Sequence, residues 1–179
     1  MTESMVLIGV IKIAVAMVLT VFGAALGALL VLRALGISDM GKHLREGNLA
    51  VALLFCSCTA AIGVMLNVAA GATFTAIDLL RYDSDKLDLV TIILYGSGHL
   101  SVALVTGVIV IIVGLKTVML ITRHFDEMDE IQNKNIAAAL MLSTFILILA
   151  FLVNPGLQTL LDGLLPLPQL GRSISIHSS

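Results

Sequence analysis

Residues 45–54 (REGNLAVALL) and residues 132–141 (QNKNIAAALM) each turn a polar loop into a long apolar run at an asparagine. The two stretches lie 87 residues apart. The same offset, without a gap, pairs further residues of distinctive type: Gly27 with Gly114, Asp39 with Asp126, and Asn67 with Asn154. Apolar matches are common in an apolar chain, so these polar and glycine matches are the informative ones. We therefore expect a tandem duplication, with one repeat over about residues 5–77 and the other over about residues 89–165.

The composition indicates a membrane protein. Apolar residues make up 59% of the 179 residues and charged residues only 12%, and the mean hydropathy is +1.09. Ordinary soluble domains are roughly 45–50% apolar and about 25% charged. A soluble chain of this length could not bury so much apolar surface, so we expect the lipid bilayer to surround it. The net charge of −2 and the lack of a basic run argue against a nucleic-acid partner.

Four apolar runs are long enough to cross a bilayer, since about 20 helical residues span a hydrocarbon core of about 30 Å. They cover residues 5–32, 48–77, 89–121 and 136–153. The predicted fold is therefore an all-α polytopic membrane protein in a single domain, residues 1–179. Its four transmembrane helices would form two helix hairpins that run parallel to each other.

The fourth run is expected to stop at Asn154, because Pro155 and Gly156 follow it. Asn154 and Pro155 also fit the N-cap and first position of a new helix. After them, leucines recur at amphipathic helical spacing: Leu157, Leu160, Leu161, Leu164 and Leu165. This pattern predicts a C-terminal helix lying in the membrane interface, followed by a tail over residues 166–179 that is expected to be disordered from Gly171 to Ser179.

The distribution of lysine and arginine predicts the orientation in the membrane. Six of them lie in or beside the first and third loops: Arg33, Lys42, Arg45, Lys116, Arg123 and Lys134. Four lie on the other side: Lys12, Arg81, Lys86 and Arg172. Positive charge favours the cytoplasm, so we expect the loops at residues 33–47 and 122–135 to be cytoplasmic and both termini to be outside.

Asn48 and Asn135 are the first candidate functional residues. An asparagine at a helix start can cap the helix by accepting a backbone N–H, a contribution of about 1 kcal/mol. The alternative places two related amides at the mouth of a small polar path. Asn67 and Asn154, towards the far ends of the same two apolar runs, allow the same two interpretations.

Lys12 and His99 occupy equivalent positions in the two repeats. An ionisable group at membrane depth is costly and is therefore a candidate for a functional role. Both residues also lie within about ten residues of their predicted helix starts, so they could instead reach the membrane interface.

The first and third loops carry opposite charge at equivalent positions. Lys42 and Arg45 belong to a basic loop, whereas Asp129 and Glu130 belong to an acidic one. The two loops are either independently solvated or paired, within one chain or between neighbouring chains. The spacing of Gly23 and Gly27 in the first run adds a second candidate contact, because small residues four apart allow another helix to approach closely. A homo-oligomer is therefore expected, with room for another membrane or peripheral protein as partner.

The sequence offers no catalytic, cofactor-binding or metal-binding motif. Cys56 and Cys58 are two residues apart and point to different faces of a helix, so they are not expected to chelate one metal. The four histidines are scattered without ligand spacing, and the chain contains no phosphate-binding loop or nucleophile elbow. We expect a protein that is not an enzyme and binds no cofactor.

The chain resembles the YjfL-like family of bacterial inner-membrane proteins. The resemblance rests on residues 46–52 (EGNLAVA) and residues 135–139 (NIAAA), where a polar loop leads into an asparagine and then a small-residue helix start. It implies four membrane helices in two tandem repeats, a bacterial inner-membrane location and no established activity. We expect an oligomeric structural or accessory component of a membrane assembly. The alternative is a small channel or transporter with a polar path past Asn48 and Asn135.

Overall fold

A computed structural model describes residues 2–82, 89–122 and 126–164, and these residues form helices joined by short turns, with no strand among them. The helices are α1 (Thr2–Ala34), α2 (Met40–Arg45), α3 (Leu49–Tyr82), α4 (Leu89–Ile121), α5 (Glu127–Gln132) and α6 (Ile136–Leu164). α1, α3, α4 and α6 each contain a segment long and apolar enough to cross a membrane. The predicted all-α fold with four membrane helices is confirmed.

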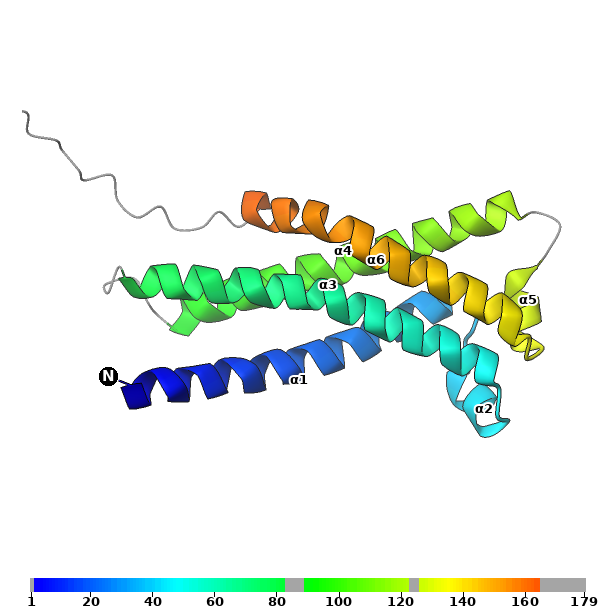
Figure 1. Cartoon of the computed structure of the whole chain (residues 1–179), viewed down its shortest axis with the longest axis horizontal. Helices are drawn as coiled ribbons and strands as arrows, with labels where there is room; N and C mark the ends of the chain where they lie inside the picture. The colour runs from blue at the N-terminus through cyan, green and yellow to red at the C-terminus, as the bar shows by residue number, and fades with distance from the viewer. Residues whose placement is uncertain (1, 83–88, 123–125, 165–179) are drawn as a thin grey trace, which may run out of the picture.

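The four long helices lie roughly lengthwise beside one another, and the short helices α2 and α5 sit together at one end (Figure 1). α3 is the central helix, because its contacts with the other three long helices, α1, α4 and α6, are the most extensive in the bundle. The core is built from small and branched apolar side chains, with fully buried Ala61, Met65 and Ile111 among them. Many other apolar side chains of the long helices remain exposed, as expected where lipid covers them.

The long–short–long order of helices occurs twice along the chain at an offset of 87 residues. α4 begins and ends 87 residues after α1, α5 begins and ends 87 residues after α2, and α6 begins 87 residues after α3. The turn before each second long helix also matches, because Gly47 has φ 69° and Lys134 has φ 72°. A lysine in this left-handed region is uncommon, whereas a glycine adopts it freely.

The predicted break at Asn154 and Pro155 is wrong, because α6 runs as one helix from Ile136 to Leu164 with Pro155 inside it. A membrane helix tolerates an internal proline, since neighbouring helices and local adjustments compensate for the lost hydrogen bond. Leu157 and Leu161 are buried in the core instead of lying in the membrane interface. The separate interfacial helix is therefore a continuation of the fourth span. The predicted tail over residues 166–179 lies outside the described residues.

The second apolar run also extends further than expected. α3 continues to Tyr82, so Asn67 lies inside the helix with an exposed side chain. Asn154 likewise lies inside α6, and its buried Oδ1 has no hydrogen-bond partner in the described part of the chain. Neither asparagine caps a helix. Loop residues 83–88, including Lys86, lie outside the described residues.

Candidate functional site: the junction of α2, α3, α5 and α6

The two short helices begin and end in the same way. The side chain of Asp39 accepts a hydrogen bond from the Lys42 backbone N–H at 2.9 Å, and that of Asp126 accepts one from the Asp129 N–H at 3.1 Å. Both aspartates are N-caps, which satisfy backbone N–H groups that a helix start leaves free. Gly36, with φ 91°, makes the turn that leads from α1 towards α2. These caps place one short helix directly before each asparagine of interest.

Asn48 joins the two halves of the chain. Its Oδ1 accepts hydrogen bonds from the backbone N–H groups of Ala50 and Val51, both at 3.1 Å, which caps α3. Its Nδ2 donates to the carbonyl oxygens of Ile131 at 3.1 Å and Gln132 at 2.9 Å, at the end of α5. The side chain is only 1% exposed. Asn48 is therefore both a cap and a bridge from α3 to α5.

The hydrogen-bonding capacity of Asn48 is fully used inside the protein. A side-chain amide has two N–H donors and an oxygen that accepts two hydrogen bonds. Two donated and two accepted bonds account for all four positions. The interpretation of Asn48 as a cap and packing residue thus agrees with its geometry, and no position is left to coordinate a passing solute.

Asn135 caps α6 in the same manner but makes no equivalent bridge. Its Oδ1 accepts from the backbone N–H groups of Ala137 at 3.0 Å and Ala138 at 3.3 Å. Its Nδ2 donates to Glu130 Oε2 at 2.8 Å, within its own half of the chain. Asn135 is half-buried, and its second N–H has no partner among the residues described. This donor is the clearest difference between the two junctions.

Lys134 makes a second bond between the halves. Its Nζ donates to the carbonyl oxygen of Glu46 at 3.0 Å, just before Asn48. The lysine occupies the position that Gly47 holds in the first half, with the same left-handed backbone. A left-handed conformation costs a side-chain-bearing residue about 1–2 kcal/mol, and the bond to Glu46 partly offsets this cost.

Among the described residues, the basic side chains Lys42 and Arg45 have their partners within the first loop. Lys42 Nζ lies 3.9 Å from Glu46 on its own side of the loop, and Arg45 Nε donates to the Gly41 carbonyl oxygen at 3.2 Å. Asp129 accepts from the Asn133 amide at 3.1 Å. Over residues 2–82, 89–122 and 126–164, neither basic side chain forms an ion pair with Asp129 or Glu130. Pairing between neighbouring chains stays a prediction.

His99 is buried in the membrane-spanning part of the bundle. It is 1% exposed, and its Nδ1 lies 3.1 Å from the Thr73 hydroxyl, which joins α4 to α3. The same hydroxyl also donates to the Ala69 carbonyl oxygen of its own helix. His99 is therefore buried between helices, and its Nδ1 takes part in a hydrogen bond from one helix to another. Lys12 lies in α1, and its side chain is outside the described residues.

Glu127 in α5 is fully buried beside the junction. The Thr122 hydroxyl donates to its Oε1, whereas its Oε2 has no partner in the part of the chain that is described. Sequence patterns did not single it out, because α5 reads as an exposed acidic helix. Its burial comes from the packing of α5 against α3 and α6.

Gly23 and Gly27 lie at close helix contacts. A Cβ at Gly27 would lie 2.7 Å from Ile62 Cδ1 on α3 and 2.9 Å from Leu104 Cδ1 on α4. A Cβ at Gly23 would lie 2.8 Å from Leu66 Cδ1. These small residues therefore serve packing within one chain, since the neighbouring side chains fill the space that a larger residue would need.

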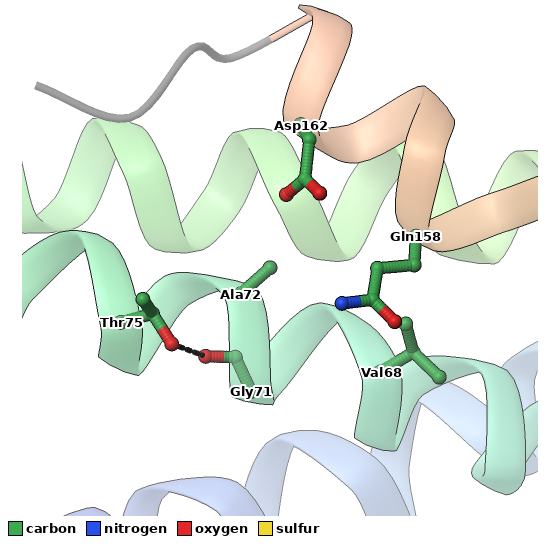
Figure 2. Close-up of a pocket in the computed structure, with 6 residues that line it drawn as sticks. All are labelled: Val68, Gly71, Ala72, Thr75, Gln158 and Asp162. Atoms are coloured by element: carbon green, nitrogen blue, oxygen red, sulfur yellow. Dashed lines mark hydrogen bonds between the residues drawn. The ribbon is translucent and has the colours of Figure 1, made fainter. Parts of the chain in front are cut away.

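A pocket lies between α3 and α6 at the end of the bundle opposite α2 and α5, with a volume of about 390 Å³. Figure 2 shows Gln158 and Asp162 extending from α6 towards α3. The residues that line the pocket include Val68, Gly71, Thr75, Gln158 and Asp162. Thr75 donates to the Gly71 carbonyl oxygen, so its hydroxyl hydrogen is used within its own helix.

The described histidine, cysteine, aspartate and glutamate side chains form no group of three or more that could hold a metal ion. Cys56 is exposed and Cys58 is buried, and both are free thiols. Thr73, Glu127 and the carbonyl groups of Ile131 and Gln132 were missed by sequence reasoning. Their roles depend on which helices meet, and no local pattern signals this.

Comparison with known proteins gives a family and no further relative. The sequence model of a family described as Domain of Unknown Function (DUF350) matches residues 4–157. This match confirms the predicted membership of a family without an established activity. The search of curated proteins and the search of solved structures both returned no match.

Proposed function

Because the chain belongs to the DUF350 family and contains four candidate membrane helices, we propose that it is a non-enzymatic integral protein of the bacterial inner membrane. In this proposal it serves as an oligomeric structural or accessory component of a membrane assembly. The observation that carries the proposal is the saturated side chain of Asn48, whose four hydrogen bonds all hold protein to protein. This buried polar side chain thus stabilises the architecture of the junction.

Self-association is supported by the exposure of the side chains of α2. This helix lies outside the membrane-spanning segments, yet it has no buried residue and its Leu44 side chain is 47% exposed. Lipid chains do not cover a leucine in a connecting loop, so burial against a protein surface would be favourable. A second chain or a peripheral protein would supply that surface.

The orientation belongs to the same proposal, with α2 and α5 on the cytoplasmic side as the lysine and arginine distribution favours. Single cysteines at Lys42 and at Asp85, each in a background lacking Cys56 and Cys58, would be exposed to an impermeant thiol reagent on intact cells. Labelling is expected at position 85 and not at position 42. The reverse pattern would invert the topology.

A small channel or transporter is the second candidate. It is favoured by the pocket that contains Gln158 and Asp162 and by the buried His99. It has less support than the structural role, because the expected path ran past Asn48, whose amide is fully occupied. Asn135 retains one N–H donor without a partner among the described residues, but this donor lies in the junction and not in the pocket.

The two candidates are separated by measuring mass and flux on the same preparation. The purified chain would be examined by light scattering in detergent and then reconstituted into liposomes loaded with a pH-sensitive or potassium-sensitive dye. We expect a complex larger than one chain and ion leakage equal to that of empty liposomes. A monomer would overturn the structural proposal, and flux abolished by Asp162→Asn would favour the conduit.

A further inference from the structure

One helix contact between the two halves of the chain has no equivalent on the other side of the pair. α3 packs substantially on α4, but the equivalent pair, α6 and α1, makes little or no contact over the described residues. A twofold arrangement of the halves would produce both contacts. The halves also meet through the equivalent helices α3 and α6, but the α3–α4 contact has no counterpart on the α6 side, where the equivalent surface stays open.

The junction shows the same asymmetry at the level of single hydrogen bonds. Asn48 binds the carbonyl groups of Ile131 and Gln132. At the offset of 87 residues, Asn135 is the equivalent of Asn48. Leu44 and Arg45 are the equivalents of Ile131 and Gln132. Asn135 makes no bond to either carbonyl group within the chain, and it keeps one donor free of any described partner.

The two short helices also differ in burial. Ile131 of α5 is fully buried beside Asn48, whereas Leu44, its equivalent in α2, is 47% exposed. Three residues of α5 are buried, and none of α2 is. None of the α2 residues equivalent to the buried residues of α5 is itself buried, so they are available to pack on another surface.

The second half carries the matching open surface on α6. Cys58, Ala61 and Met65 of α3 are fully buried. Their equivalents 87 residues later are exposed on one side of α6: Phe145, Ile148 and Leu152. This α6 face is the surface on which an incoming first half would pack.

Charge complementarity favours a second copy as the occupant. If α2 of one chain packs beside Asn135 of another as α5 packs beside Asn48, the α2 helix that carries Lys42 and Arg45 lies at the same end of the bundle as the α5 helix that carries Asp129 and Glu130 (Figure 1). α2 is basic in its last turn, and α5 is acidic in its first turn. Opposite charges on the meeting surfaces set register and suppress the reverse pairing.

We propose that the chain binds copies of itself head to tail, with the α1–α2 face of one copy seated on the α5–α6 face of the next. The second N–H of the Asn135 amide then donates to the Leu44 or Arg45 carbonyl group of the neighbouring chain, at the place where Asn48 donates to Ile131 and Gln132 within one chain. Such contacts close into a ring or extend as a filament, depending on the rotation per copy. This inference rests on the proposed oligomeric function and names the surfaces that carry it.

The inference is tested by photo-crosslinking the full chain in membranes. Leu44→p-benzoylphenylalanine places the crosslinker on the open face of α2. A matched control, Leu49→p-benzoylphenylalanine, places it on the first residue of α3, where both Leu49 and its equivalent Ile136 are exposed. Chains labelled with ¹⁴N and ¹⁵N are coexpressed, so that mass spectrometry recognises peptides joined between two copies.

Mixed-isotope adducts from position 44 are expected on residues 132–152 of the other copy, at least several-fold more than from position 49. Adducts on α1 or α2 of the other copy would mean that like faces meet, and would overturn the head-to-tail arrangement. An oligomer without adducts from position 44 would also overturn it while leaving the proposed function standing. A monomer would refute both.

A charge-swap mixture gives a second, independent measurement. One variant carries Lys42→Glu with Arg45→Glu, and the other carries Asp129→Lys with Glu130→Lys. Each alone should lose assembly at low salt, read by native mass spectrometry, and a mixture of the two should recover mixed complexes. Assembly of each variant equal to that of the wild type, with no preference for mixed complexes, would show that these charges do not meet.

Discussion

Replacing Asn48 with serine separates its role as a bridge from its role as a cap. Serine caps a helix start about as well as asparagine, so Asn48→Ser keeps the acceptor for the Ala50 and Val51 N–H groups. It removes the two N–H donors that reach Ile131 and Gln132 at 3.1 and 2.9 Å. Each hydrogen bond contributes about 0.5–1.5 kcal/mol net, so a loss of about 1–3 kcal/mol is expected.

The matched control is Asn135→Ser, which also keeps its cap. It loses only the bond to Glu130, at a half-buried position where water can replace the amide. We expect a loss below about 1 kcal/mol, because a group that regains water avoids the penalty of an unsatisfied buried one. Free energies of unfolding would be measured by steric trapping in bicelles. Equal losses for the two serine variants would refute the reasoning that Asn48 ties the two halves together.

Two further substitutions test packing and the buried histidine. Gly27→Leu should reduce stability by about 1–3 kcal/mol or more, because even a Cβ would lie 2.7 Å from Ile62 Cδ1. Ala34→Leu, at an exposed position of the same helix, should change stability by less than about 0.5 kcal/mol. An equal effect of both variants on thermal unfolding in detergent would place Gly27 on a lipid-facing surface. Thr73→Val removes the hydroxyl that meets His99 at 3.1 Å and should cost about 0.6 kcal/mol, the average for hydrogen bonds between membrane helices, and no more than about 1.7 kcal/mol. Thr75→Val is its control, since the Thr75 hydroxyl bonds only its own helix, and no difference between the two valine variants would show that the His99 contact contributes nothing.

Composition and periodicity predicted the four spans, since nothing but a bilayer accommodates so much apolar surface. The third apolar run, residues 89–121, has the same bounds as α4, and the turn before Asn48 starts α3 where expected. These features depend on local sequence and on solvent, which a sequence displays directly.

The end of α6 and the bridge made by Asn48 could not be predicted in the same way. Pro155 stops a helix in water, but in this chain neighbouring helices hold it within α6. The bonds from Asn48 reach residues 83 and 84 positions away, and the Thr73–His99 pair joins residues 26 positions apart. Such contacts follow from the three-dimensional arrangement of α3, α4 and α5, which no local pattern encodes.

The number of chains per particle in a bilayer tests self-assembly most directly. The chain, carrying one fluorophore at its C-terminus, would be placed in lipid nanodiscs large enough for several copies, or imaged in native membrane vesicles without detergent. Counting photobleaching steps per particle then gives the number of copies. We predict a population with two or more steps that persists on dilution into excess lipid. Particles that bleach in a single step at every lipid-to-protein ratio would contradict self-assembly.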